Sequence, residues 1–435
     1  MARRGAAGVP NYPQDRLAFV EGLRGLAALY VVLTHIRSMV DPGPVFVGAA
    51  SAAPAWLAKF LPVLGFGHVA VAAFIVLSGF CLQTSLFNHS DGRLRSLPKF
   101  FARRAWRILP AYYSCLALSL IVCAFVTSKQ TGYPFAQYVP ADARAIVSHL
   151  FLVHNFDPTL MFKINGVLWS IALEAQLYLV FPFLVAMLFK VGRVGLVALT
   201  SLFSALCLWF IPTANAGKSY IWFLPLFVLG MVAAHFAYRP HRKIGVVPKL
   251  GALWALIGIG IFAVGVTWKS DPRWVSFVLR DLGVGVSVAA FIYVGSVRPS
   301  SWVSRLFGAE ALVKLGAFSY SLYLIHHPLL QVLYVNRPAF AQSVEMATLY
   351  LFAAGVPIIL LCSWVFAWFF ERPFMVNRKV LEPILREGLG TPLALPLRTL
   401  GRASEARYLG PRGTPKFAVI EVDESVPLPA PIHLP

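Results

Sequence analysis

Residues 61–87 read LPVLGFGHVAVAAFIVLSGFCLQTSLF and contain no charged side chain. The run is longer than the roughly 20 apolar residues that an α-helix needs to cross the hydrocarbon core of a bilayer. Apolar sequence continues far beyond it, because the 435-residue chain is 58% hydrophobic and 13% charged, with a mean hydropathy of +0.70. A soluble domain carries about 25% charged residues. The composition therefore predicts an all-α, polytopic membrane helix bundle and excludes a soluble enzyme.

About ten segments are apolar and long enough to be transmembrane helices, namely 17–36, 61–87, 108–127, 166–189, 194–211, 220–238, 250–268, 275–296, 316–335 and 346–370. Residues 145–164 are different, because an apolar octet is followed there by His154, Asn155 and Asp157. Polar backbone is tolerated at membrane depth only where it packs against protein. We therefore expect this stretch to be re-entrant or interfacial.

The distribution of Lys and Arg sets the direction of the chain. If the N-terminus is inside, most basic residues fall on inner segments, among them residues 93–107 and the tail after residue 371. Counting 145–164 as a full span would invert every later segment and remove this asymmetry. The sequence thus predicts ten spans with both termini cytoplasmic. It divides into a cytoplasmic segment (1–15), a membrane domain (16–372) and a proline-rich cytoplasmic tail without a packed core (373–435).

The net charge of +20 does not indicate a nucleic-acid partner, because the basic residues lie in short clusters between apolar runs. The five cysteines lie inside apolar runs, without a CxxC pair or a histidine spacing that binds zinc. We therefore expect neither a nucleic-acid partner nor a metal site.

Charged and polar residues inside the first segment are candidates for function, because charges within a span are costly. Glu21 and Arg24 are one turn apart and can pair across that turn. Arg24 and His35 are close to three turns apart, so they share one helix face about 16 Å apart along the axis. The alternative interpretation is an interhelical salt bridge and an interfacial histidine.

Glu174 is predicted to lie two to three turns inside the membrane, on the same helix face as Ser170. A buried carboxylate is expensive unless it is paired or hydrogen-bonded. A ligand, a basic partner such as His35 or a structural hydrogen bond would each satisfy it. The pair His326 and His327 would either line a pocket or lie at the membrane interface.

A cluster of Arg103, Arg104 and Arg107 interleaves with aromatic residues on the predicted inner loop. Such a cluster serves as an anchor for anionic lipid headgroups in many membrane proteins. The second interpretation is a phosphate-rich cytosolic ligand, which arginine forks bind in a bidentate manner.

Five short motifs follow one another along the chain. The first is Arg24, in LRGLAAL, with His35; the second is FIVLSGF, which contains Ser78; and the third is the pair Arg104 and Arg107. The fourth consists of Trp169, Ser170, Glu174 and Tyr178, and the fifth is SYSLYLIHHP at 319–328. Together they resemble the integral-membrane acyltransferase family 3. This bacterial group O-acylates polysaccharides, lipopolysaccharide O-antigen, nodulation factors and some antibiotics. His326 aligns with the family histidine and His327 is an extra one. Glu21 stands where the family usually has Asp.

The resemblance implies a multi-pass protein of the bacterial cytoplasmic (inner) membrane. It implies acetyl-CoA, or another acyl-CoA, as a donor substrate on the cytoplasmic side, with no permanently bound cofactor. It also implies a carbohydrate or glycoside acceptor on the far side, and the lipid bilayer as surroundings. The rival interpretation is a transporter or flippase for an anionic or sugar substrate, with the buried charges lining its pathway. The cytosolic arginine pair together with His35 favours the acyltransferase.

The resemblance also suggests roles. His35 would be the general base, because a histidine titrates near neutral pH. Glu174 would orient His35 or bind the acceptor, and Arg24 would line the donor channel. Arg103, Arg104 and Arg107 would hold the phosphates of the donor. The remaining expected substrate-binding residues are Glu21, Ser78, Trp169, Ser170, Tyr178, Tyr320, Tyr323 and His326.

Overall fold

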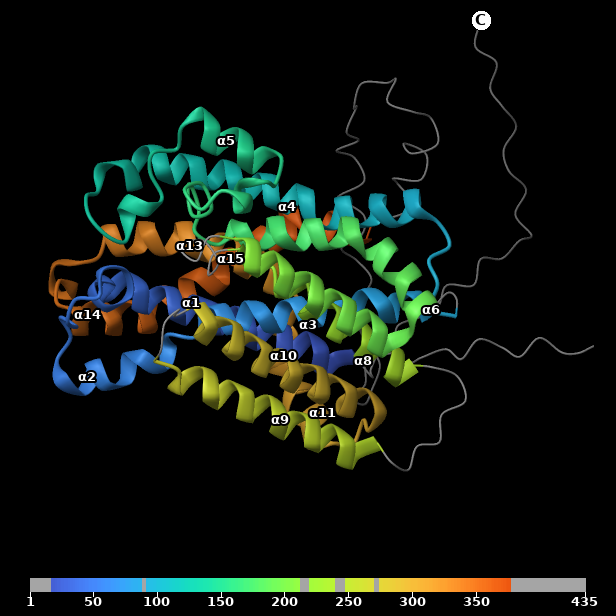
Figure 1. Ribbon diagram of the computed structural model, residues 1–435. Helices are drawn as coiled ribbons and strands as arrows, with labels where there is room; N and C mark the ends of the chain where they lie inside the picture. The colour runs from blue at the N-terminus through green and yellow to red at the C-terminus, as the bar shows by residue number, and fades with distance from the viewer. Residues whose placement is uncertain (1–16, 88–90, 212–218, 239–246, 270–273, 377–435) are drawn as a thin grey trace, which may run out of the picture. The chain divides into compact units, whose positions relative to one another are not determined.

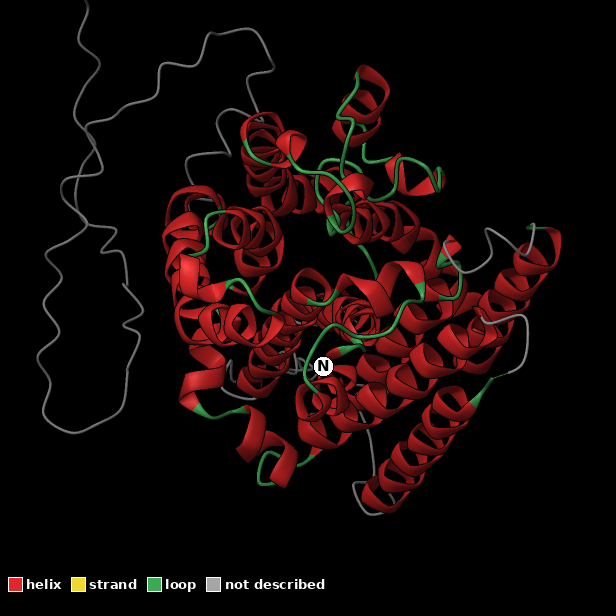
Figure 2. Cartoon of the chain, turned by 90° about the vertical axis from the view of Figure 1, so that its left-hand side faces the viewer, coloured by secondary structure: helices red, strands yellow, loops and turns green. Residues whose placement is uncertain are grey.

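The computed structural model describes residues 17–87, 91–211, 219–238, 247–269 and 274–376. Within these ranges the chain forms helices joined by loops and contains no strand (Figure 2), so the all-α prediction is confirmed. The predicted cytoplasmic segment 1–15 and the tail from residue 377 onward lie outside the described residues.

The helices follow one another along the chain as labelled in Figure 1. Their bounds are α1 Ala18–Val40, α2 Ala55–Phe60, α3 Gly67–Phe87, α4 Leu97–Phe125, α5 Ala143–Leu150, α6 Leu168–Phe210, α8 Phe223–Tyr238, α9 Val247–Thr267, α10 Trp274–Val297, α11 Trp302–Phe307, α12 Glu310–Gly316, α13 Ser319–Val335, α14 Val344–Tyr350, α15 Val356–Phe370 and α16 Arg372–Val376.

All ten predicted spans fall on helical parts of the chain, although 166–189 and 194–211 share α6 and 346–370 is divided between α14 and α15. Within the described residues, six helical stretches are long and apolar enough to cross a membrane, and they are Ala18–Val40, Ala55–Phe87, Leu97–Lys129, Leu168–Phe210, Trp274–Val297 and Val344–Phe370. Phe223–Tyr238 and Gly251–Thr267 are apolar but shorter. Multiple membrane spans are thus supported, whereas the number ten and the cytoplasmic termini stay predictions.

Helix α6 joins two predicted spans, 166–189 and 194–211, in one stretch of 43 residues. The two parts meet at Gly192, whose φ of 76° and ψ of 179° are not helical. A residue with a side chain rarely adopts a positive φ, whereas glycine does so without steric cost. The sequence boundary between the two spans therefore corresponds to a kink, and no separate loop divides them.

Residues 143–164 do not form a long helix. Helix α5 has eight residues, a length of about 12 Å, which is too short to cross a bilayer. The hydroxyls of Tyr112 and Tyr113 in α4 donate to the carbonyls of His149 and Leu150, at 2.8 and 2.9 Å. The segment is therefore fastened to α4, in agreement with the prediction that it does not span. Its place at the membrane interface stays a prediction.

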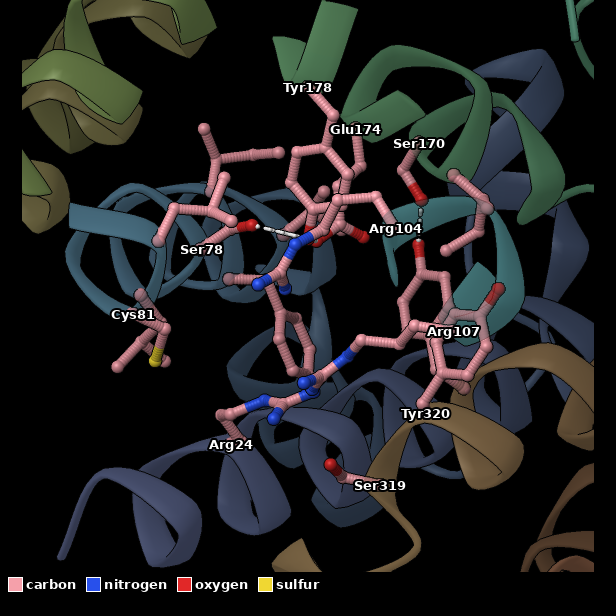
Figure 3. Close-up of a pocket in the computed structure, with 17 residues that line it drawn as sticks. Arg24, Ser78, Cys81, Arg104, Arg107, Ser170, Glu174, Tyr178, Ser319 and Tyr320 are labelled. Atoms are coloured by element: carbon pink, nitrogen blue, oxygen red, sulfur yellow. Dashed lines mark hydrogen bonds between the residues drawn. The ribbon is translucent and has the colours of Figure 1, made fainter. Parts of the chain in front are cut away.

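The motif glycine Gly79 allows α3 to approach α8. A Cβ atom at this position would lie 2.0 Å from the carbonyl oxygen of Phe227, well inside van der Waals contact. Small residues are the usual means by which membrane helices bring their backbones together. Because Gly79 faces α8, its neighbour Ser78 in the sequence points toward the cavity between α3, α4 and α6 (Figure 3).

Candidate functional site

Side chains from α1, α3, α4, α6 and α13 converge on one cavity of about 60 Å³ (Figure 3). Nine of the expected site residues line it, and these are Arg24, Ser78, Arg104, Arg107, Ser170, Glu174, Tyr178, Tyr320 and Tyr323. Helices that are far apart in the sequence thus bring residues of all five motifs to a single place. A lipid-anchor role for Arg104 and Arg107 alone does not explain this convergence.

Three of the residues around the cavity are arginines. The guanidinium groups of Arg24 and Arg107 point toward each other in Figure 3, and that of Arg104 lies 5.9 Å from the centre of the Tyr178 ring. The Arg24 side chain is 18% exposed, and its Nη1 is 3.5 Å from the half-exposed carboxylate of Glu21. Like charges repel strongly where water is scarce. The arrangement therefore favours an anionic ligand.

Arg104 in particular has unused binding capacity. Its Nε is buried and has no hydrogen-bond partner within the described part of the chain. A buried donor without a partner costs free energy that an incoming acceptor would recover. Arg103, by contrast, is exposed and does not line the cavity, although it was expected to act with its two neighbours.

Glu174 is held by two hydroxyl groups. Ser78 Oγ donates to Glu174 Oε1 at 2.8 Å, and the Tyr178 hydroxyl donates to the same oxygen at 2.5 Å. The two hydroxyl oxygens are themselves 2.9 Å apart. The carboxylate makes no hydrogen bond with His35 in this arrangement, so the geometry does not support the suggested orienting role of Glu174. Glu174 instead lines the same cavity as the three arginines.

Tyr323 connects the cavity to a group of histidines. Its hydroxyl lies 2.6 Å from Ser170 Oγ, and its ring centre is 5.9 Å from that of His326. Tyr320 donates to the carbonyl of Ile108 at 3.1 Å. Trp169 does not line the cavity, because its ring stacks on that of Tyr220 with centroids 4.1 Å apart.

His35 and His326 form a hydrogen-bonded pair beside this cavity. His326 Nε2 is 3.2 Å from His35 Nδ1, and His326 Nδ1 is 3.0 Å from the Leu322 carbonyl. A carbonyl only accepts, so His326 Nδ1 carries the hydrogen and, in the neutral ring, Nε2 is the acceptor. His35 Nδ1 is then the donor, shared with the Val31 carbonyl at 2.9 Å.

This assignment leaves His35 Nε2 with a lone pair. No hydrogen bond uses that nitrogen within the residues that the structure describes. The basic nitrogen of His35 is therefore available to a ligand. The sequence had suggested Glu174 as the residue that orients His35, but the residue in hydrogen-bond contact is His326, 291 positions away.

A second set of polar residues next to the histidine pair was not identified from the sequence. Tyr138, from the loop after α4, lies 3.0 Å from Nε2 of His327, the extra histidine of the fifth motif. The ring of His327 is in turn 5.2 Å from that of His35. Tyr138 has neither a motif nor a periodic position, so only the folded chain reveals it.

Comparison with known proteins agrees with these motifs. The model of the acyltransferase domain family Acyl_transf_3 matches residues 17–368. The chain is 24% identical over 370 residues to the Staphylococcus aureus (strain COL) protein named "Putative O-acetyltransferase SACOL0978", covering 77% of this chain and 55% of that protein. It is 26% identical over 354 residues to O-acetyltransferase OatA of S. aureus (strain NCTC 8325 / PS 47), in an alignment that covers 75% of this chain and 52% of OatA.

The chain therefore spans about half the length of the curated relatives that it matches. No solved structure matches it. Because the family model covers most of the chain, including all five motifs that converge in the fold, the chain belongs to the acyltransferase 3 family.

Proposed function

We propose that the chain is a membrane-embedded O-acyltransferase. It moves an acyl group, in the first instance acetyl, from cytosolic acyl-CoA to a hydroxyl of a cell-surface or exported carbohydrate or glycosylated metabolite. Its place is the cytoplasmic membrane of a bacterium. The observation that carries this proposal is the cavity in which Arg24, Arg104 and Arg107 meet, with the free nitrogen of His35 nearby.

The arginine cavity suits the donor. Coenzyme A carries several phosphates, which guanidinium groups bind through charge-assisted, often bidentate hydrogen bonds. Arg104 and Arg107 lie in the first half of α4, on the predicted inner side, and Arg24 lies near the start of α1. The distance along α1 from Arg24 to His35 is about 16 Å, which an extended acyl-pantetheine arm covers. Phosphates at the arginines would thus place the thioester near the histidine.

The histidine pair suits the acyl transfer. His35 Nε2 would accept the proton of the acceptor hydroxyl while the hydroxyl oxygen attacks the thioester carbon. A carbon–oxygen bond forms, the carbon–sulfur bond breaks, and the proton passes from His35 to the departing thiolate. His326 and the Val31 carbonyl keep the hydrogen of His35 on Nδ1, so that Nε2 is unprotonated at the start of the cycle.

The proposal is tested with membrane vesicles from cells that make the protein and from cells that do not. Acetyl-CoA labelled in the acetyl group is supplied on the cytoplasmic face, and ester-linked label is measured in the carbohydrate fraction. Protein-dependent labelling that alkali releases supports the proposal. Equal labelling with and without the protein contradicts it.

A further inference from the structure

Tyr138 and His327 form a buried hydrogen-bonded pair outside the arginine cavity. Their side chains are 3% and 1% exposed, and the Tyr138 hydroxyl is 3.0 Å from His327 Nε2. The two rings meet edge to face with centroids 4.6 Å apart. The extra histidine of the fifth motif is thus fixed against a tyrosine of an outer loop.

The hydrogen-bond donors in this pair can be assigned along a short chain of contacts. Thr127 Oγ1 donates to Gln331 Oε1 at 2.9 Å, which turns Gln331 Nε2 toward His327 Nδ1 at 3.3 Å. An amide nitrogen only donates, so His327 Nδ1 is the acceptor. The hydrogen of the neutral His327 ring then lies on Nε2 and is donated to the Tyr138 oxygen.

A second donor reaches the same oxygen. Gln137 Nε2 donates to the Tyr138 hydroxyl oxygen at 2.6 Å. Both lone pairs of that oxygen are therefore occupied, and the hydroxyl hydrogen of Tyr138 has no acceptor within the described residues. A buried donor without an acceptor is costly, and such groups are few in native structures.

Gly166, two residues before α6, packs closely against the Tyr138–His327 pair. A Cβ atom at position 166 would lie 2.9 Å from Tyr138 Cε1 and 3.5 Å from His327 Nε2. Even the smallest side chain would therefore press on the Tyr138 ring, whereas its contact with His327 would be an ordinary one. Gly166 lies three residues before Trp169, the first residue of the fourth motif, and it does not line the arginine cavity.

His327 contacts both Tyr138, which has the unused donor, and His35, which has the unused acceptor. The His327 ring is 5.2 Å from the His35 ring and 4.6 Å from the Tyr138 ring. His35 offers a lone pair at Nε2, whereas Tyr138 offers a hydrogen. A molecule with several hydroxyl groups can donate a hydrogen bond to His35 Nε2 and accept one from Tyr138.

We propose that Tyr138 binds the acyl acceptor by donating a hydrogen bond to one of its oxygens, while the reacting hydroxyl of the acceptor lies at His35 Nε2. His327 is a positioning residue, because it acts on the acceptor only through Tyr138. The inference rests on the proposed acyltransferase function, and it names an acceptor subsite lined by Tyr138 and His35 on the far side of the donor cavity.

The test uses the full chain in membrane vesicles, with the acceptor that those membranes contain and with labelled acetyl-CoA at saturating concentration. Replacing Tyr138→Phe removes only the hydroxyl. Loss of one hydrogen bond between neutral groups should lower the initial transfer rate about threefold to tenfold, while the acetyl-CoA concentration at half-maximal rate stays within about twofold. The matched control is Tyr133→Phe, because Tyr133 belongs to the same loop, is 48% exposed and stacks on Phe46. The control should transfer like the wild type.

Two variants at position 327 separate positioning from packing. His327→Gln keeps an N–H donor at the place of Nε2 and should retain most of the rate, whereas His327→Leu should lower it as much as Tyr138→Phe. The double variant Tyr138→Phe/His327→Leu should be no worse than either single one, because both remove the same contact. If the Tyr138→Phe protein fails to fold, the comparison of His327→Gln with His327→Leu still tests the subsite.

A Tyr138→Phe rate within twofold of the wild type would overturn the subsite, as would equal losses in His327→Gln and His327→Leu. Those results leave the acyltransferase proposal standing as long as the wild type labels the carbohydrate fraction. If the wild type transfers no label, the proposed function itself fails, and the two failures are thereby distinguished.

Discussion

His326 Nε2 accepts a hydrogen bond from His35 Nδ1 over 3.2 Å and, together with the Val31 carbonyl at 2.9 Å, keeps the basic lone pair of His35 on Nε2. The two residues come from α1 and α13, which pack against each other. A histidine that already carries its hydrogen on Nδ1 needs no tautomer change before Nε2 takes up a proton. This relationship leads to a first prediction at position 326.

His326→Gln should keep much of the transfer rate, because the amide oxygen of Gln can accept from His35 Nδ1. His326→Leu should lower the rate up to about tenfold, since His35 then loses one of the two acceptors that hold its hydrogen on Nδ1. Initial rates of acetyl transfer in vesicles check both variants, and acetyl-CoA binding serves as the measure of intact folding. Equal rates for the Gln and Leu variants would show that His326 serves packing only.

The double variant Arg104→Ala/Arg107→Ala should insert normally and bind acetyl-CoA much more weakly. Each charge-assisted contact is worth roughly 1.5–3 kcal/mol, which is about tenfold to a hundredfold in the dissociation constant. Arg103→Ala is the matched control, because Arg103 is on the same helix but exposed and outside the cavity. Isothermal titration of purified protein measures the constants. An unchanged dissociation constant for acetyl-CoA in the double variant would show that Arg104 and Arg107 do not bind the donor and would favour their role as lipid anchors.

Gly79→Ala should lower the free energy of unfolding by about 1–3 kcal/mol, because the added methyl group overlaps the Phe227 carbonyl at the α3–α8 contact. Gly260→Ala is the control, since a Cβ there meets no atom within 4 Å. Alanine favours a helix over glycine, so the control should be unchanged or slightly more stable. Thermal unfolding in detergent measures the difference. An equally stable Gly79→Ala protein would mean that α3 and α8 separate without cost.

Stability should fall at acid pH because of two stacked histidines outside the long apolar helices. The rings of His149 and His154 lie 3.7 Å apart, only 8° from parallel, and both are fully buried. Burial lowers the pKa of His149 to about 4, and burial together with His149 lowers the pKa of His154 to about 3, from an ordinary 6.5. Between these values the unfolded chain binds protons that the folded chain does not.

The contribution of this pair is therefore fully present above pH 6.5 and is lost as the pH falls toward 4 and 3. The melting temperature of the wild type should be lower at pH 5 than at pH 7.5. The variant His149→Phe/His154→Phe should show a smaller difference between these two pH values. If the difference in melting temperature between pH 5 and pH 7.5 were the same in the variant and the wild type, groups other than His149 and His154 would cause the acid sensitivity.

The helices and much of the cavity could be predicted from the sequence. Apolar runs mark the spans because lipid imposes length and composition on them. The motif residues that line the cavity, such as Arg24, Ser78 and Glu174, stand out because polar groups are costly inside such runs. The kink at Gly192 was not foreseen, since a charged interruption of an apolar run indicates a loop as readily as a bend.

The partners of the site residues could not be predicted. Hydrogen bonds between α1 and α13, or between Tyr138 and His327, join positions that are 291 and 189 residues apart. Spacing along one helix places Arg24 and His35 on a face, but it does not say which neighbouring helix meets that face. For Glu174 the sequence leaves open a ligand, a basic partner such as His35 or a structural hydrogen bond, and the folded chain supplies hydrogen bonds from Ser78 and Tyr178.

The most direct test of the account is the rate of acetyl transfer by the His35→Ala protein, measured together with its binding of acetyl-CoA. General base catalysis contributes typically 10²–10⁴-fold, so the variant should bind acetyl-CoA like the wild type and transfer acetyl groups slower by that factor. A variant that binds the donor and keeps more than about a tenth of the wild-type rate, well above that range, would contradict the assignment of His35 as the base.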